Sequence, residues 1–420
     1  MERSQPYRLW VLSELYYPED SATGYYITQI AEAMAGFCKV EVLSAQPTYR
    51  ARGTRAAGDE VLHNVHIHRC AATTLNKDIL FFRLLNLCTI TISLFFNAVW
   101  KIRQSDIVLV VTNPPTLPFV ALLASKLRGA KLILRIEDIY PDAMVAAGMV
   151  KRTSLLVRLL NVLHRSLYRN ADRVVTLGGD MLRLVHRKLG VASSHVSTIT
   201  NWADSDQIMP LERSDNPILK KLGLSEKFVI QYSGNMGRTH DIEVLIRSAK
   251  MLKDDPTFHF LFAGAGAKES WLKRAVRDLG LGNVTILPPH PRSELVQLLN
   301  ACDLAVISFV EGMSGVSVPS RMYNNFAAGK PVLALADADS ELAQVVQGAR
   351  IGWVVRPGSE EGAVQAIRAA ASNRPMLAEM SRRASALVLN QHTRRYVMEQ
   401  YEKLVQTVAL GGTSNRRGAS

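Results

Sequence analysis

The stretch DLAVISFVEGMSGVSVPSRMYNNFAAGKPVLAL, residues 303–335, contains most of what decides the fold. An apolar run over 304–309 leads into a polar loop, a segment with helical spacing and a second apolar run over 332–335. Pro319 suits the first turn of a helix, and Gly329 suits its end. Short runs of Val, Ile and Leu that alternate with helical segments predict parallel strands joined by crossover helices.

The same alternation extends in both directions along the chain. In the first half the predicted strands are Leu9–Leu15, Val40–Ala45, Ile107–Val111, Leu132–Ile136, Val174–Leu177 and Val196–Thr200. In the second half they are Phe228–Ser233, Phe258–Ala263, Val284–Leu287, Leu304–Phe309, Val332–Leu335 and Trp353–Val355. The pattern predicts an α/β protein with two Rossmann-like, doubly wound domains facing each other across a cleft.

The polar, proline-containing segment from Asn201 to Leu222 marks the predicted boundary between these domains. We expect a first domain over residues 1–203 and a second over 204–385. A helical pattern over 386–410 is long enough to return and pack on the first domain. Residues 411–420 have the composition of a solvated tail.

Composition narrows the class of protein. With 420 residues, 48% hydrophobic and 21% charged, the chain is expected to be globular. Its four cysteines are widely spaced and form no C-x-x-C pair, which argues against a disulfide framework or a zinc site. The charged N-terminus does not resemble a signal peptide. These features favour a protein of the reducing cytoplasm.

Positive charge is concentrated in the first half. The net charge is +13, and the segment from Lys151 to Gly190 holds nine Lys and Arg against two acids. Such a bias suits phosphate groups or an anionic membrane surface. Nucleic acid is the other anionic partner, but no zinc-finger, RNA-recognition or helix-turn-helix signature supports it. The uncharged stretch Leu84–Trp100 is either a helix lying on a bilayer or a buried helix of the domain.

Ligands of open α/β sheets bind beyond the carboxyl ends of the strands, so the loops there are the candidate site. After the first strand, Gly24 precedes a helix whose free amides are available to an anion, but an ordinary loop and helix cap explain this segment by itself better. After the strand over 228–233 come Gly234, Arg238 and His240, which form either a phosphate-binding nest or a plain turn.

Two further loops add candidates. The segment AGAGA brings Gly264 close to a flat ligand such as a nucleobase, but it lacks the third glycine of a dinucleotide fingerprint, which disfavours a nicotinamide-dependent oxidoreductase. The loop before Pro319 offers hydroxyls and amides, Arg321 adds a guanidinium, and Asn324 lies one helical turn further on. The alternative is an amphipathic helix with polar surface groups.

These motifs in this order resemble family 4 glycosyltransferases of the GT-B fold. The resemblance rests on LYYPEDSATGYY, YSGNMGRTHDIEVLI, FAGAG, ACDLAVISF and SVPSRMYNNFAAGKPVLA, and it covers most of residues 8–405. The most similar branch builds colanic acid, O-antigen and other bacterial surface polysaccharides. The resemblance implies a nucleotide-diphosphate-sugar donor, a saccharide acceptor, lipid-linked in this branch, and transfer with retention, without a metal or other cofactor.

The resemblance also assigns residues. By position, Gly24 would meet the donor phosphates, Gly234, Arg238 and His240 would form the phosphate loop, Gly264 would lie beside the base, and Ser317, Ser320 and Arg321 would lie near the diphosphate and sugar. Two family glutamates are replaced here by Val316 and Asn324, and the usual Arg and Lys of the phosphate loop by Asn235 and His240. Asn324 can still donate a hydrogen bond to ribose.

In the first domain, the segment LRIEDIYPDAM resembles the strand-end acceptor segment of the family. Glu137 or Asp138 would then lie by the acceptor hydroxyl, whereas the alternative is that both carboxylates cap the next helix. No cluster of His, Asp and Glu has the spacing of metal ligands. Two rival functions remain open from the sequence: a sugar-nucleotide epimerase of the same fold, and a non-catalytic subunit that binds a sugar nucleotide.

Overall fold

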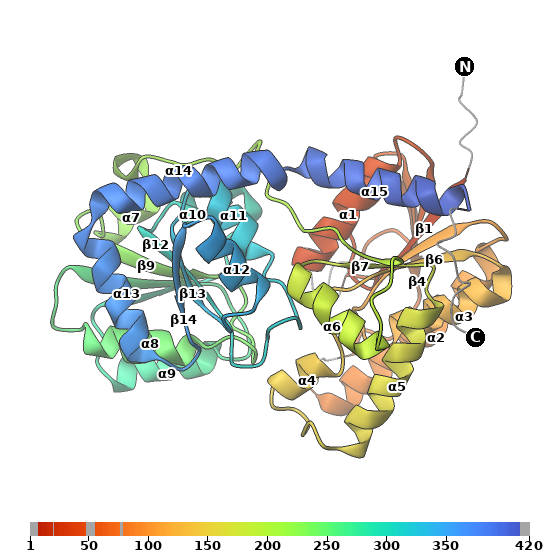
Figure 1. The fold of residues 1–420 in the computed structure, drawn as a ribbon, viewed down its shortest axis with the longest axis horizontal. Coiled ribbons are helices and arrows are strands. Elements are labelled where there is room, and N and C mark those ends of the chain that lie inside the picture. Colours follow the sequence, from red (N-terminus) through yellow and green to blue (C-terminus); the bar gives the residue numbers. More distant parts are fainter. Residues whose placement is uncertain (1–6, 20, 48–54, 76–78, 412–420) are drawn as a thin grey trace. The chain divides into compact units, whose positions relative to one another are not determined.

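A computed structural model describes residues 7–19, 21–47, 55–75 and 79–411, so the predicted tail lies outside the described residues except for Gly411. The chain forms two compact units (Figure 1). The first contains residues 1–141, 153–200 and 397–420, and the second contains 142–152 and 201–396. The predicted return helix is two helices, α14 (Arg374–Gln391) and α15 (Arg394–Ala409), and the chain passes to the first unit at Val397.

An eight-stranded sheet with the order β3-β4-β2-β1-β5-β6-β7-β8 forms the centre of the first unit. Its strands are β1 (Arg8–Leu12), β2 (Lys39–Ala45), β3 (Asp59–Leu62), β4 (Val65–Cys70), β5 (Ile107–Val111), β6 (Lys131–Arg135), β7 (Arg173–Thr176) and β8 (Val196–Thr198). All five residues of β5 are buried, because helices cover both faces of a parallel sheet.

The edge of this sheet differs from the prediction. Strands β3 and β4 form an antiparallel hairpin around His63 and Asn64, both of which have positive φ. Their alternating, partly exposed residues include two histidines and give no continuous apolar run, so the periodicity of long buried strands does not detect them. The sequence prediction therefore missed both strands of this edge, one of which runs antiparallel to its neighbour.

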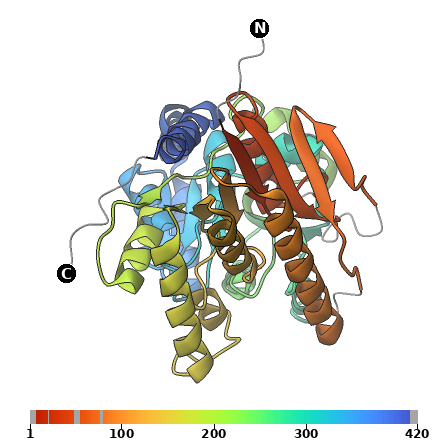
Figure 2. The same cartoon turned by 90° about the vertical axis from the view of Figure 1, so that its right-hand side faces the viewer.

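Four helices of the first unit lie side by side on one face of the sheet (Figure 2). They are α2 (Leu80–Lys101), α3 (Leu117–Arg128), α5 (Leu155–Asn170) and α6 (Gly179–Leu189). The connections through these helices all advance toward β8, whereas α1 (Ala22–Met34) connects β1 to β2 in the opposite direction. Right-handed crossovers therefore place α1 on the other face. Helix α15 packs on this unit, where its buried Tyr401 hydroxyl accepts a hydrogen bond from Arg135 Nε at 2.8 Å.

The second unit contains a six-stranded, fully parallel sheet with the order β11-β10-β9-β12-β13-β14. The strands are β9 (Phe228–Ser233), β10 (Phe258–Ala263), β11 (Val284–Leu287), β12 (Leu304–Ser308), β13 (Val332–Leu335) and β14 (Gly352–Val355). The six predicted strands of this half agree with these bounds to within one residue. Aromatic side chains of β9 and β10 pack with apolar side chains of the surrounding helices in one buried core.

The helices of the second unit begin with the short α4. They are α4 (Asp142–Ala146), α7 (Pro217–Leu222), α8 (Ile242–Met251), α9 (Glu269–Asp278), α10 (Leu295–Leu299), α11 (Arg321–Ala327), α12 (Glu341–Gly348), α13 (Glu360–Ser372) and α14. Helix α11 begins at Arg321, two residues later than Pro319 suggested, because the carbonyl of Pro319 accepts from Met322 N in a preceding turn.

Candidate functional site

The loops after β9 and β10 meet through two glycines. Gly234 and Gly264 have φ of 131° and 136°, which side chains other than hydrogen rarely allow. A Cβ atom on Gly264 would lie 2.1 Å from the carbonyl oxygen of Gly234, and one on Gly234 would lie 3.2 Å from Arg321 Nη1. Only glycine at both positions allows this close approach of two loops and a guanidinium.

Backbone hydrogen bonds fix the two loops against each other. Met236 N donates to the carbonyl of Ala265, and Lys268 N donates to the carbonyl of Met236, each at 2.9 Å. A third bond, from Val310 N to the carbonyl of Thr239 at 2.9 Å, ties the first loop to the segment after β12. The loop that carries the predicted phosphate ligands is thus held from two sides.

Arg321 supplies the positive charge at the junction of these loops. Its guanidinium carbon lies 4.8 Å from the centre of the Tyr232 ring, and its Nη1 donates to the carbonyl of Ser233 at 3.2 Å. No carboxylate among the described residues forms an ion pair with it. A guanidinium held in place with its charge uncompensated is suited to bind a diphosphate.

His240 lies beside Arg321 and is buried. Its ring stacks on Phe309 with ring centres 5.5 Å apart. Burial first, and then the charges of Arg321 and Lys268, hold the pKa of His240 well below its usual value. The imidazole is therefore neutral at physiological pH, and it offers a hydrogen bond rather than a charge.

Lys268, which was not among the residues predicted from the sequence, holds the backbone of His240. Its ammonium donates to the carbonyl of His240 at 2.7 Å and pairs with Glu243 at 2.8 Å. Lys268 comes directly after the segment AGAGA, where a lysine is usually exposed to solvent, so the sequence does not predict this contact. Tyr232 was missed for the same reason, since a buried aromatic residue at a strand end is typical of any core.

The amides predicted from the loop after β12 are partly occupied. Asp337 Oδ2 accepts hydrogen bonds from Gly312 N and Ser314 N, both at 3.0 Å. An anion would have to displace this carboxylate to use those amides. Asp337 lies two residues after the end of β13, so its place after a strand was the signal that could have identified it.

The remaining predicted donor residues lie around this junction or in the solvent. Ser317, Ser320 and Asn324 are half-buried, and neither serine side chain makes a hydrogen bond with a described residue. Asn324 follows Arg321 by three positions on α11, which places the two on neighbouring sides of one turn. Arg238 is exposed and forms no ion pair within the described part of the chain.

The predicted residues of the first unit are held by their own neighbours. Gly24 N donates to the Ser21 hydroxyl at 3.1 Å, which caps α1, and a Cβ atom there would lie 2.8 Å from the carbonyl of Glu19. The ordinary explanation of a helix cap therefore accounts for this glycine as well as a phosphate contact does.

Glu137 and Asp138 lie in the loop after β6, separated from the strand by Ile136. The hydroxyl of Thr112 accepts from Glu137 N at 3.0 Å and from Asp138 N at 3.3 Å. The Glu137 carboxylate pairs with Arg135, whose side chain is fully buried. This ion pair restrains the side chain of Glu137 at the strand end. Burial, and to a lesser extent the charge of Asp138, raises the pKa of Tyr140.

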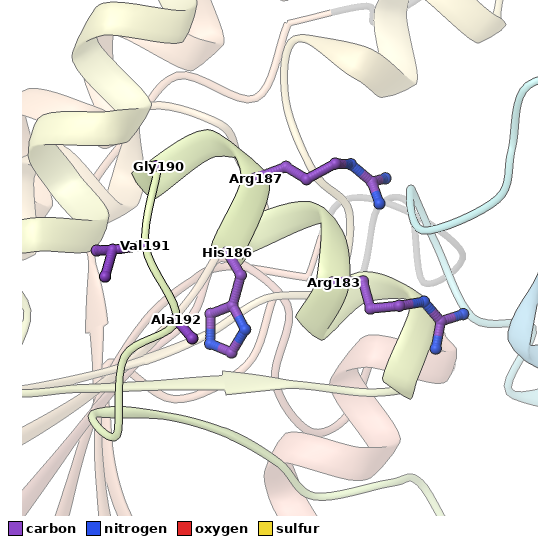
Figure 3. A pocket seen from close by; sticks show the side chains of 6 residues that line it. All are labelled: Arg183, His186, Arg187, Gly190, Val191 and Ala192. Atoms are coloured by element: carbon purple, nitrogen blue, oxygen red, sulfur yellow. The ribbon is translucent and has the colours of Figure 1, made fainter.

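The first unit also has a hollow at the end of α6, with a volume of about 470 Å³. The last turns of α6 and the segment that follows this helix line the hollow. His186 lies next to Ala192, whereas the side chains of Arg183 and Arg187 extend away from Ala192 (Figure 3). None of the predicted donor residues lines it. In the described ranges, no group of three or more His, Cys, Asp and Glu is arranged to hold a metal ion.

Two family models match the chain. Residues 215–386 match "Glycosyl transferases group 1", and residues 21–202 match "Glycosyl transferase 4-like domain". The probable glycosyltransferase WbjE of Pseudomonas aeruginosa is 33% identical over 61% of this chain, and the match spans 64% of that relative. The putative colanic acid biosynthesis glycosyl transferase WcaI of Escherichia coli is 29% identical over 84% of this chain and 90% of its own length.

Solved structures share the fold. Sucrose-phosphate synthase of Thermosynechococcus elongatus superposes with a TM-score of 0.77 at 15% identity and covers 97% of this chain and 100% of its own. HepE of Anabaena, solved with UDP and glucose, superposes with a TM-score of 0.73 at 14% identity, over 96% and 100% of the two chains. These likenesses show the GT-B fold, as the sequence predicted.

Proposed function

The chain belongs to the glycosyltransferases that these two family models describe, and from this premise we propose that it transfers a sugar from a nucleotide diphosphate to a saccharide acceptor in the synthesis of bacterial surface polysaccharide. The acceptor we propose is lipid-linked, and the place of action is the cytoplasm. The observation that carries the proposal is the junction of Gly234, Gly264 and Arg321. It combines close-packed loops, a positioned guanidinium and a neutral imidazole.

The donor is proposed to be a UDP-sugar held by the second unit. HepE, a protein of the same fold, was solved with UDP and with UDP-glucose. In this chain, Arg321 would pair with the diphosphate, His240 would donate a hydrogen bond to a phosphate or sugar oxygen, and Asn324 would replace the ribose-binding carboxylate. The backbone at Gly264 would lie against the base.

The reaction that we propose retains the configuration of the transferred sugar. The bond from the anomeric carbon to the phosphate oxygen breaks, and the acceptor oxygen bonds to that carbon on the same face. The nucleoside diphosphate leaves with the bonding electron pair, so a cation placed at its phosphates lowers the barrier. The acceptor proton passes to the departing phosphate oxygen or to a carboxylate, for which we assign Asp138, with Glu137 as the positioning residue.

A transfer assay tests this function directly. Purified protein is incubated with UDP-sugars or GDP-sugars and a lipid-linked saccharide, and the product is analysed for its linkage and anomeric configuration. A product with the donor's configuration is expected. Conversion of the donor to another sugar nucleotide without an acceptor would identify an epimerase, and donor binding with neither reaction would identify a binding subunit.

We further propose that transfer needs no metal ion, because Arg321 is placed to take the role of one. Activity is then expected to be the same in EDTA as in magnesium. Loss of transfer in the chelator, restored by added magnesium, would overturn this part of the proposal.

A further inference from the structure

Helix α2 exposes a long apolar surface in the first unit. Asn86, Ile90, Leu94 and Ala98, spaced four residues apart, form its buried edge. On the opposite side the exposed residues are equally regular: Ile92, Phe96 and Trp100 are 56%, 66% and 90% exposed. Among the described residues, the helix over Phe81–Lys101 is also the one segment that is long and apolar enough to cross a membrane, by length and composition alone. Its buried edge shows, however, that it packs on the unit along its length.

Helix α5 has the same character and divides into three faces. Val157, His164, Leu167 and Tyr168 form the buried face. Leu155, Leu159 and Leu163 repeat every four residues and are 78%, 57% and 42% exposed. The third face carries Arg158, Arg165 and Arg169, which are exposed as well. An exposed apolar stripe bordered by arginines is unusual for a helix facing water, where a polar outer face is expected.

The charge of this helix layer has one sign. Helices α2, α3 and α5 contain seven Lys and Arg and no Asp or Glu. Helix α3, between the other two, adds the exposed Leu123 and Leu127 beside Lys126 and Arg128. Helices α2, α3 and α5 lie side by side (Figure 2), and we call their outer face, with its exposed apolar and cationic side chains, the apolar-basic face.

A cationic hollow lies at the border of this face. Its volume is about 400 Å³, and it is lined by Arg158, Asn161, Val162, Arg165 and Lys188. Lys188 Nζ donates to Asn161 Oδ1 at 2.6 Å, and Arg165 Nε donates to the carbonyl of Lys188. These bonds hold two of the three cations around the hollow. A phosphate group there would meet three positive side chains next to the exposed Val162.

We infer that the apolar-basic face docks the first unit on an anionic lipid bilayer, with its apolar side chains in the acyl boundary and a lipid phosphate in the hollow between α5 and α6. Combined apolar and cationic contacts give stable attachment where one kind alone does not. A second copy of the chain is a poor occupant, since a symmetric contact would bring together seven cations from each copy without one acid.

Vesicle flotation tests the inference and does not depend on the transfer reaction. Wild-type protein should float with phosphatidylglycerol-containing vesicles at low salt. It should float less at high salt, because salt screens the surface potential. It should float little with phosphatidylcholine vesicles alone, because their surface carries no net negative charge. Phe96→Glu with Trp100→Glu, and separately Leu159→Glu, should each lower binding about tenfold or more, because each replaces exposed apolar surface with a charge of the wrong sign. Arg158→Gln should weaken binding to anionic vesicles alone.

Matched controls lie on the second unit. Leu389 is 64% exposed on α14, and Arg274 is exposed on α9, so Leu389→Glu and Arg274→Gln make the same chemical changes elsewhere and should bind as wild type. UDP binding and the unfolding midpoint of each variant report whether it folds. Wild-type protein that stays in solution at low salt, or variants of the face that float as well as the controls, would overturn the inference. A dimer lost in the same variants would assign the face to a second copy, and a need for detergent to extract the protein would mean that α2 inserts deeply instead of docking at the surface.

Discussion

The helix layers of the two units differ in what they leave exposed, although both cover parallel sheets. In the second unit, α8 buries Ile242, Leu245 and Ile246 and exposes Arg247 and Lys250, with Met251 at its last position. In the first unit, α5 buries one side and exposes Leu155 and Leu159 on another. In the second unit, loops bring Gly234 and Gly264 together beside Arg321. In the first unit, the apolar-basic face is formed by helices. In our proposals, one architecture thus supplies a ligand site in one unit and a binding surface in the other.

The largest expected effect separates two adjacent carboxylates of the first unit. Asp138→Asn should lower kcat about 100- to 10,000-fold, the range for loss of a positioned proton acceptor. Glu137→Gln should have a smaller effect on kcat and should instead reduce stability, because it leaves the buried Arg135 without its counter-ion. Single-turnover rates and urea unfolding of both variants give the comparison. Equal, small effects on the rate would mean that the departing phosphate takes the proton unaided.

A second change tests how tightly the second unit is packed at its site. Gly264→Val should cost about 3 kcal/mol or more of stability and remove donor binding, because its Cβ would overlap the Gly234 carbonyl at an unfavourable φ. Gly282→Ala is the control, since no atom lies within 4 Å of its added Cβ and its φ is not positive. Chemical denaturation and UDP titration measure both. A stable Gly264→Val variant that binds UDP normally would refute the close packing of the two loops.

The sheet of the second unit was predictable almost to the residue, because strands buried on both faces are continuous apolar runs such as Phe228–Ser233. The hairpin of β3 and β4 was not, because its residues are only partly buried. The glycines and Arg321 could be proposed from their places after strands. Lys268 could not, since its role depends on which backbone atoms its loop brings within reach, and sequence spacing does not determine that.

Acidic pH should act on the second unit through His392. Burial lowers the pKa of His392 to about 4, and its ring lies against Tyr323 on α11 with ring centres 4.9 Å apart. The unfolded chain takes up a proton near its ordinary pKa of about 6.5, which the folded state does not, so the group destabilises the fold as pH falls from about 6.5 to 4. The loss is roughly 3 kcal/mol over that window and absent above it.

The variant His392→Gln isolates this effect. Its free energy of unfolding should fall less between pH 6.5 and 4 than that of the wild type, while the two curves should run parallel above pH 6.5. Urea unfolding across the pH range provides both curves. Parallel curves over the whole range would show that His392 titrates alike in the folded and unfolded chains.

Calorimetric titration of UDP into the wild type and Arg321→Ala tests the central claim most directly, because the claim assigns the donor diphosphate to one guanidinium at the junction of the loops. Loss of this charge-assisted hydrogen bond should weaken UDP binding by about 1.5–3 kcal/mol, whereas the exposed Arg238→Ala should change it less. Equal affinities of wild type and Arg321→Ala for both UDP and GDP would contradict the account.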